Sequence, residues 1–181
     1  MHFTVFNTKL GHSGVVYWTR DEESKAVHIL LPTSKDALME KIVFRYPTAS
    51  ETRGTEVAEL VRSIQDFFLG APEQIPMRLV DTTVCTPFQL SVLLQERTIP
   101  RGKTSSYGRL AKKLNSNAVR AVGSALAKNP FPIVVPCHRA VRSDRTLGGF
   151  QGGLNMKRRI LTLEGIRFDG SSRVHPDSFI G

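Results

Sequence analysis

The apolar pattern of the chain changes at residues 70–76, GAPEQIP, where one glycine and two prolines interrupt it. Before this segment, HFTVF and GVVYWT alternate around the glycine-bearing turn KLGHSG, and AVHILL follows. Such alternation predicts a hairpin and a third strand. After the segment, the pattern indicates short helices with tight turns. A chain of 181 residues is long enough for two compact domains. We therefore expect an α/β domain over residues 1–82 and a mainly α-helical domain over residues 83–168.

The expected first domain contains one clear amphipathic helix. Apolar residues recur at spacings of three and four from Val57 to Phe68, glutamates occupy the first turn, and Gly70 follows the end. No motif here indicates chemistry, so we expect a structural role for this domain. The last segment, residues 169–181, is polar and rich in turn formers, which predicts a loosely packed tail.

Charge is distributed unequally. Residues 1–90 carry nine Lys and Arg against eleven Asp and Glu, whereas residues 91–181 carry sixteen against five. A surplus confined to one half indicates a polyanionic partner, usually nucleic acid, although a solvated basic face is the alternative. No segment approaches the roughly 20 apolar residues of a membrane span, and the N-terminus lacks a signal-peptide pattern. We expect an intracellular, cytoplasmic protein without membrane contact.

The second half predicts three helices. One begins near Phe88 and stops before Pro100, one covers SSYGRLAKKL with Ser105 or Ser106 as its cap, and one covers AVRAVGSALAK. The last two are joined by the short turn NSN. Two short helices joined in this way outline a helix-turn-helix, although many small helical domains share the outline.

The third of these helices has distinct faces at 100° per residue. We expect the core side to consist of Val119, Val122, Gly123 and Leu126. A polar ridge is formed by Arg120, Ser124 and Lys128, and a strip of small residues by Ala118, Ala121 and Ala125. A strip without bulk beside one long arginine suits a helix that approaches another molecule closely. The alternative is a good helix former that fills a surface.

The segment NPFPIVVPCHRAV, residues 129–141, places one of only two cysteines between a proline and a histidine. Residues 133–135 predict a buried strand that Pro136 ends, which would hold Cys137 rigidly. A thiol needs a base to become the reactive thiolate. His138 is adjacent, but neighbouring side chains on an extended segment point to opposite sides, so one water could bridge them. Glu164, at the end of the helix expected in LNMKRRILTLEG, is a candidate to orient the histidine.

Other interpretations of these residues are open. Cys137 and His138 could be ordinary core residues, and we expect that role for Cys85 in TTVCTPFQ. The two cysteines could form one disulfide at most, and a reducing compartment would keep both as thiols. No C-x-x-C or H-x-x-x-H occurs, so we expect no metal.

Several ordered motifs resemble the O6-alkylguanine-DNA alkyltransferases, also called methylated-DNA–protein-cysteine methyltransferases. They are SYGRLA, RAVGSAL, NPFPIVVPCHR and GGFQGGLNMKRRILTLEGI, and the resemblance spans roughly residues 83–166. It implies a ribonuclease H-like first domain, and a second domain with a winged helix-turn-helix and the active-site cysteine.

The resemblance also implies roles for individual residues. Cys137 is similar to the acceptor thiolate, and His138 with Glu164 is similar to the relay that deprotonates it through a water. Asn129 is similar to the asparagine that stabilises the turn before the active site. Tyr107 is similar to the tyrosine against the extruded base and its phosphate. The expected DNA contacts are Arg120, as the finger that fills the vacated space, with Ala121, Gly123, Ser124, Tyr107 and Arg139.

The implied activity is DNA repair in a single turnover. As a DNA-associated monomer that needs no cofactor, the protein would bind double-stranded DNA through the minor groove and flip out O6-alkylguanine, with O4-alkylthymine as a further substrate. It would transfer the alkyl group irreversibly to Cys137. Alternatives are a lesion binder that transfers nothing, a Cys-His hydrolase, and a DNA-binding regulator.

Three residues depart from the family pattern: Phe150 stands where tyrosine is frequent, Ala140 where valine is common, and Cys85 where glycine is usual. They concern the range of substrates, and we expect Ala140 to widen the pocket.

Overall fold

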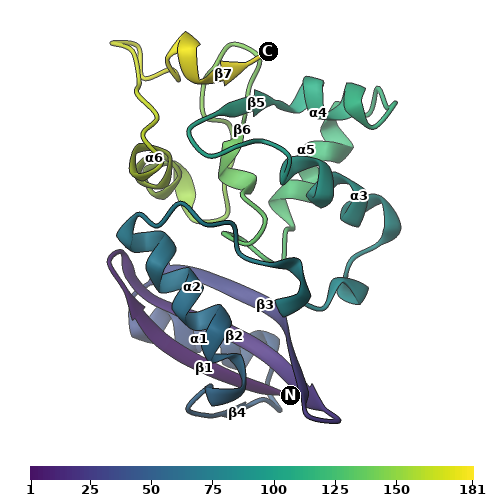
Figure 1. The fold of residues 1–181 in the computed structure, drawn as a ribbon, viewed down its shortest axis with the longest axis vertical. Coiled ribbons are helices and arrows are strands. Elements are labelled where there is room, and N and C mark those ends of the chain that lie inside the picture. The colour runs from purple at the N-terminus through teal and green to yellow at the C-terminus, as the bar shows by residue number, and fades with distance from the viewer. The chain divides into compact units, whose positions relative to one another are not determined.

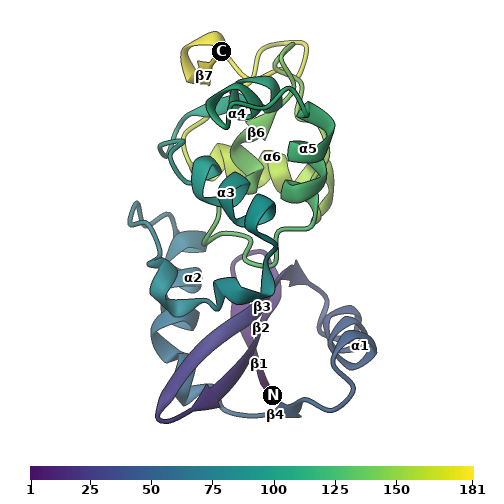
Figure 2. The ribbon, with the colours of Figure 1, turned by 90° about the vertical axis from the view of Figure 1, so that its right-hand side faces the viewer.

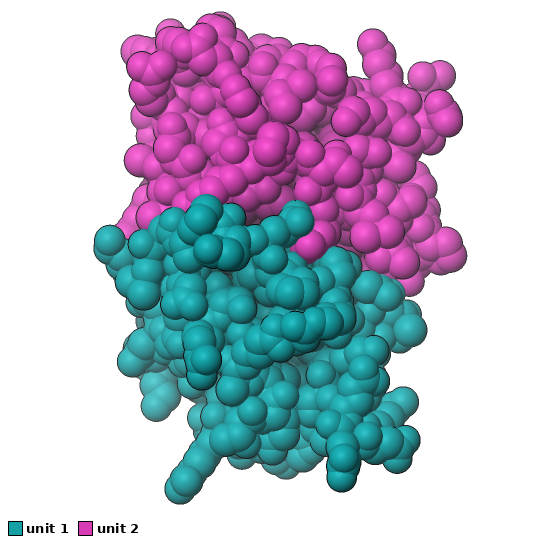
Figure 3. Space-filling view, in the orientation of Figure 1, with its two compact units in different colours: residues 1–84, 130–134 teal, residues 85–129, 135–181 magenta.

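The computed structural model describes residues 1–181, which form two compact units, coloured separately in Figure 3. Unit 1 consists of residues 1–84 and 130–134, and unit 2 of residues 85–129 and 135–181. The segment 130–134 therefore packs with the first unit, although it directly precedes the sequence around Cys137. A backbone hydrogen bond of 2.8 Å from the Ile29 amide to the Pro130 carbonyl ties it there.

Unit 1 is built on a four-stranded sheet in the order β3-β2-β1-β4. The hairpin of β1 (His2–Thr8) and β2 (Gly11–Arg20) and the third strand β3 (Glu23–Thr33) confirm the strands expected from alternation. The short strand β4 (Ser50–Glu51) adds in parallel to β1.

Two helices cover opposite faces of this sheet, as Figures 1 and 2 show. Helix α2 (Ala58–Leu69) is the expected amphipathic helix, and Gly70 ends it in the left-handed conformation. Helix α1 (Lys35–Arg45) has no counterpart in the sequence prediction, although Ser34 caps it by accepting from the Ala37 amide. Its buried residues Leu38 and Ile42 join a core cluster with Phe3, Val16, Val27 and Leu30. Short 3-10 helices lie at Thr55–Val57, Met77–Leu79 and Thr82–Val84.

Unit 2 contains the expected short helices. Helix α3 (Pro87–Glu96) has proline in its first turn and Thr86 as its cap, and helix α4 (Tyr107–Lys113) is capped by Ser106. Residues 114–118 connect α4 to α5 (Val119–Ala127). Glu164 directly follows helix α6 (Gly153–Leu163) as its C-cap residue, so it lies at the helix end as the sequence predicts.

A small parallel sheet supports these helices, with β5 (Thr104–Ser106) between β6 (Ala140–Val141) and β7 (Phe179–Ile180). The expectation of a loosely packed tail is therefore wrong. A 3-10 helix at Pro176–Ser178 leads into β7, Val174 is fully buried, and Phe179 packs against the core cluster of Val141, Leu161 and Ile166. Its polar residues serve turns, while its few apolar ones pack.

Residues 133–135 are buried but do not form the expected strand. Ile133 has a φ of +76°, a left-handed conformation that is incompatible with a strand. Cys137–Arg139 form a 3-10 turn directly after it. None of the helices is long and apolar enough to cross a membrane.

Candidate active site

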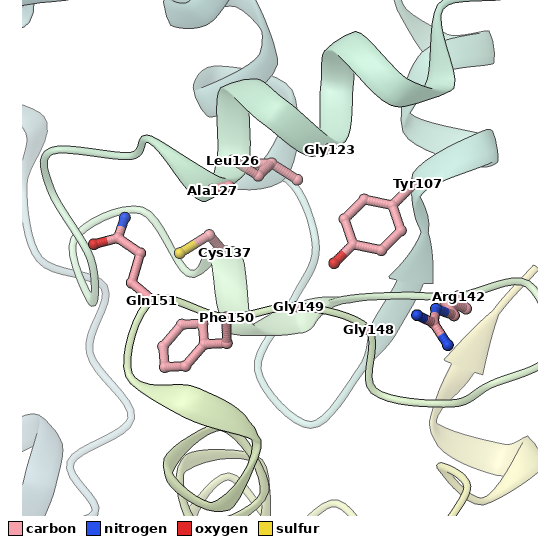
Figure 4. A pocket seen from close by; sticks show the side chains of 10 residues that line it. All are labelled: Tyr107, Gly123, Leu126, Ala127, Cys137, Arg142, Gly148, Gly149, Phe150 and Gln151. Atoms are coloured by element: carbon pink, nitrogen blue, oxygen red, sulfur yellow. The ribbon is translucent and has the colours of Figure 1, made fainter.

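Cys137 lines a cavity of about 380 Å³ that lies entirely within unit 2. Its wall also includes Tyr107 from α4 and Leu126 from α5, and the segment of residues 148–151 closes it (Figure 4). Gly148 has a φ of +64°, and a Cβ there would lie 3.0 Å from the Tyr107 hydroxyl. Only glycine therefore lets the segment pass so close to the tyrosine.

The Cys137 thiol is protonated at rest. Burial raises its pKa to about 11, and a hydrogen bond with the Asn129 side chain offsets only part of this effect. Asn129 is itself buried, and its Nδ2 donates to the Val135 carbonyl over 3.1 Å. Asn129 thus fixes the turn before the cysteine and touches the thiol at the same time.

His138 and Glu164 form a buried pair behind the cysteine. His138 Nε2 lies 3.0 Å from Glu164 Oε1, and neither side chain is exposed. Burial lowers the pKa of His138, and the charge and hydrogen bond of Glu164 offset part of that decrease. The imidazole is therefore neutral near neutral pH and able to accept a proton.

Arg139 holds the carboxylate of Glu164 from the other side. Its Nε donates to Oε2 over 2.9 Å and its Nη2 to Oε1 over 2.7 Å, while Nη1 donates to the Ile99 carbonyl over 2.7 Å. Burial alone would raise the pKa of Glu164, but His138 and Arg139 lower it to about 2. Glu164 therefore stays ionised and can stabilise a charged imidazole without taking its proton.

Lys157 lies beneath the glycine-rich segment. This fully buried ammonium donates to the carbonyls of Ala140, Leu147 and Gly149 over 2.6, 2.5 and 3.2 Å. Burial lowers its pKa to about 8. It thereby joins β6 to the segment that lines the cavity.

Helix α5 presents a mixed surface beside the cavity. Arg120, Ala121 and Ser124 are exposed, Gly123 lines the cavity, and Val122 and Leu126 are buried. No group of three or more His, Cys, Asp or Glu side chains is placed to hold a metal ion.

Comparison with known proteins identifies the family of the chain. Residues 87–166 match the family described as 6-O-methylguanine DNA methyltransferase, DNA binding domain. A protein named methylated-DNA–protein-cysteine methyltransferase from Methanothermobacter thermautotrophicus is 40% identical over 114 residues, which are 63% of this chain and 64% of that one. A DNA base-flipping protein from Thermus thermophilus is 37% identical over 121 residues, 66% of this chain and 81% of its own length. The chain belongs to the methylated-DNA–protein-cysteine methyltransferase family.

The solved structures agree with this assignment. The DNA complex of Mycobacterium tuberculosis OGT superimposes with a TM-score of 0.73 at 26% identity, covering 91% of this chain and 92% of that one. The mixed α/β fold is therefore that of the methyltransferases. The chain spans less than two thirds of the length of the Methanothermobacter relative.

The structure gathers most residues that the sequence selects. Cys137, His138, Glu164, Asn129 and Tyr107 surround one cavity or the turn behind it. Arg139 differs. The sequence places it among the DNA contacts, but its side chain is only 9% exposed and is bound to Glu164. It is a buried partner of the His138–Glu164 pair, because its guanidinium neutralises a carboxylate that would otherwise be buried beside the histidine alone.

Four smaller expectations also change. Val119 is 42% exposed, whereas Ala125 is buried; α5 packs against α3, and Gln89 Nε2 of α3 donates to the Ala125 carbonyl over 3.3 Å. Cys85 is half-buried and is not a core residue. Ala140 is buried and does not line the cavity, so it cannot widen it.

The sequence prediction misses Glu96, Arg142, Gln151 and Lys157. Arg142 and Gln151 line the cavity, and Gln151 Nε2 donates to the Asn129 carbonyl over 2.7 Å. Lys157 has a signal in the sequence, because it precedes the buried Ile160, Leu161 and Glu164 by three, four and seven residues on one helical face. Glu96 follows Val92 and Leu93 at the same kind of spacing.

Proposed function

We propose that this protein repairs O6-alkylguanine in duplex DNA by transferring the alkyl group to Cys137. The observation that carries the proposal is the position of Cys137: its side chain lines a cavity of about 380 Å³, and His138 beside it is held by Glu164. An alkyl group on a stacked guanine is out of reach of a protein side chain, so the nucleotide has to rotate into the cavity.

The chemistry follows from the charges of the resting site. The Cys137 proton passes to neutral His138 through one water as the sulfur attacks the alkyl carbon. A carbon–sulfur bond forms, the carbon–oxygen bond breaks, and its electron pair leaves with guanine, which takes up a proton. Glu164 stabilises the charged imidazole during this step. The thioether is stable, so each chain acts once.

Binding to DNA is assigned to α4 and α5, which we infer to be the helix-turn-helix of a winged domain. The exposed small residue Ala121 allows α5 to enter the minor groove, and Arg120 fills the space of the rotated nucleotide. The basic surplus of residues 91–181 adds salt-dependent attraction to phosphates. We assign residues 83–168 to this work, residues 1–82 to a ribonuclease H-like structural domain, and expect a monomer that also accepts O4-alkylthymine.

Labelled O6-methylguanine duplex tests the proposal. We expect one methyl group per chain, mapped by mass spectrometry to Cys137, loss of transfer in Cys137→Ser, and retention in the matched control Cys85→Ser. Labelling that exceeds one equivalent, or that falls on another residue, would contradict the proposal.

A second candidate is a lesion binder that flips the base and transfers nothing, which the similarity to the Thermus base-flipping protein favours. The presence of a sulfur nucleophile in the cavity supports transfer instead. Tight binding to the modified duplex with an unmodified Cys137 would identify the binder.

A further inference from the structure

Glu96 is an ionisable residue that the proposed reaction does not use. It lies at the end of α3, its side chain has no exposure to solvent, and neither carboxyl oxygen makes a hydrogen bond of normal geometry. A buried carboxyl group without a hydrogen bond of normal geometry is costly, so a glutamate kept in such a place is unusual for a residue that only packs.

The surroundings of Glu96 connect it to the acceptor cysteine. The backbone amide of Ala140 faces the Glu96 carboxyl. The backbone carbonyl of Ala140 accepts a hydrogen bond from Lys157 Nζ over 2.6 Å. Ala140 begins β6, immediately after the turn of Cys137–Arg139. Glu96 from α3 and Lys157 from α6 therefore approach one residue of the backbone that follows the cysteine.

Each element around Glu96 contributes its own charged groups. The turn of Cys137–Arg139 contributes the thiol and the guanidinium, α6 contributes Lys157, and α4 contributes Tyr107. Helix α5 also packs against α3, but its one charged residue, Arg120, is exposed. Arg97, directly after Glu96, is half-buried. Lys157 is thus the buried cation whose charge acts on both the Glu96 carboxyl and the Cys137 sulfur.

The charges of Glu96 and Lys157 act on the sulfur in opposite directions. A negative Glu96 raises the pKa of Cys137, whereas a positive Lys157 lowers it. Burial raises the pKa of Glu96 to about 8 and lowers that of Lys157 to about 8. Near neutral pH the Glu96 carboxyl is therefore protonated and the Lys157 ammonium is charged, so the two groups together carry one positive charge. Above about pH 8 this positive charge is lost.

We propose that Glu96 is a positioning residue that controls how strongly the Lys157 ammonium favours the thiolate of Cys137. While the carboxyl is protonated, the ammonium acts unopposed; as the carboxyl ionises and the ammonium loses its proton, the sulfur is left beside a negative charge. The inference rests on the proposed function, since it concerns the reactivity of the acceptor sulfur. It predicts that alkaline solution accelerates the sulfur less than it accelerates an ordinary thiol.

The pH dependence of iodoacetamide modification tests this on the full chain without DNA, with Cys137 and Cys85 separated by peptide mass mapping. In the wild type, the rate at Cys137 should level off near about pH 8, whereas in Glu96→Gln, where only the charge of Lys157 is lost, it should rise more steeply. At about pH 9 the variant should react about tenfold faster, the effect of one unit in the thiol pKa, and at about pH 6 the two should be equal. A structural defect alone would shift the rate at every pH.

Glu96→Leu provides a second neutral side chain in case the amide variant does not fold. The same steeper rise is expected. Identical pH profiles in the wild type and in a folded neutral variant would overturn the inference. Absence of methyl transfer from DNA, with the pH response intact, would instead count against the proposed function.

Discussion

His138 Nε2 and Glu164 Oε1 lie 3.0 Å apart, and both side chains are sealed from solvent. Arg139 binds the same carboxylate with two nitrogens, so Glu164 cannot move away when the histidine changes charge. The pair therefore orients the histidine and provides the negative charge that a protonated imidazole needs.

Replacing Glu164 by Gln should slow alkyl transfer by about a hundredfold, because general-base catalysis loses its supporting charge. It should also lower the free energy of unfolding by about 3–5 kcal/mol, because Arg139 remains buried without its partner. Single-turnover rates and urea unfolding measure the two effects. The matched control is Glu59→Gln, which breaks an exposed pair with Arg78 and should leave both quantities unchanged. Equal effects of the two substitutions would refute this assignment.

The contribution of Glu164 to the free energy of unfolding should depend on pH in acid solution. The pKa of Glu164 is lowered from an ordinary 4.5 to about 2, so its stabilising contribution is present above about pH 4.5 and is lost as the pH falls through about 2. The difference in unfolding free energy between the wild type and Glu164→Gln should therefore shrink in that window. A constant difference down to about pH 2 would show that the carboxylate is not stabilised in the folded state.

Arg120→Ala should reduce methyl transfer from duplex DNA by about tenfold or more, because extrusion of a nucleotide costs a few kcal/mol and the arginine offsets part of it. Transfer from the free modified base should be unaffected, since Arg120 is exposed on α5 and does not line the cavity. Rates with the two substrates make the comparison, and Arg62→Ala removes the same charge from α2 as a control. An equal loss with both substrates would assign Arg120 to the cavity.

Deletion of residues 176–181 should loosen the start of α4. Strand β7 pairs with β5, which directly precedes Tyr107, and Ser105 Oγ donates to the Ile180 carbonyl over 3.1 Å. Arg109 of α4 also donates to the Gly181 carbonyl. We expect faster amide hydrogen exchange at residues 104–109 and weaker binding to DNA. Unchanged exchange there would show that β6 alone supports β5.

Glu96→Leu should stabilise the protein more at alkaline than at acidic pH. The folded-state pKa of Glu96 is raised from 4.5 to about 8, so the wild type loses stability as the pH rises through this range. The gain from leucine should grow by on the order of 3 kcal/mol between about pH 5 and pH 8. Urea unfolding at the two pH values measures it, and a gain independent of pH would indicate packing alone.

The local pattern of the sequence determined the elements whose signals are periodic and capped. Alternation located β1–β3, and the spacing of apolar residues with Gly70 located α2. The β-branched residues 133–135 favour a strand, but Ile133, which belongs to unit 1, adopts a left-handed conformation that a strand does not allow. Helix α1 was missed, although Ser34 and Asp36 mark its start.

By itself, the sequence determined which residues are the candidate nucleophile, its neighbouring histidine and the carboxylate at the end of α6, because a thiol between proline and histidine and an acid at a helix end are local features. Only the tertiary structure decided that Arg139 serves Glu164 rather than DNA, and that Glu96 and Lys157 are buried beside the cysteine. The physical reason is desolvation: whether an ionisable side chain meets water or another charge depends on which distant elements cover it, and residue spacing does not encode that.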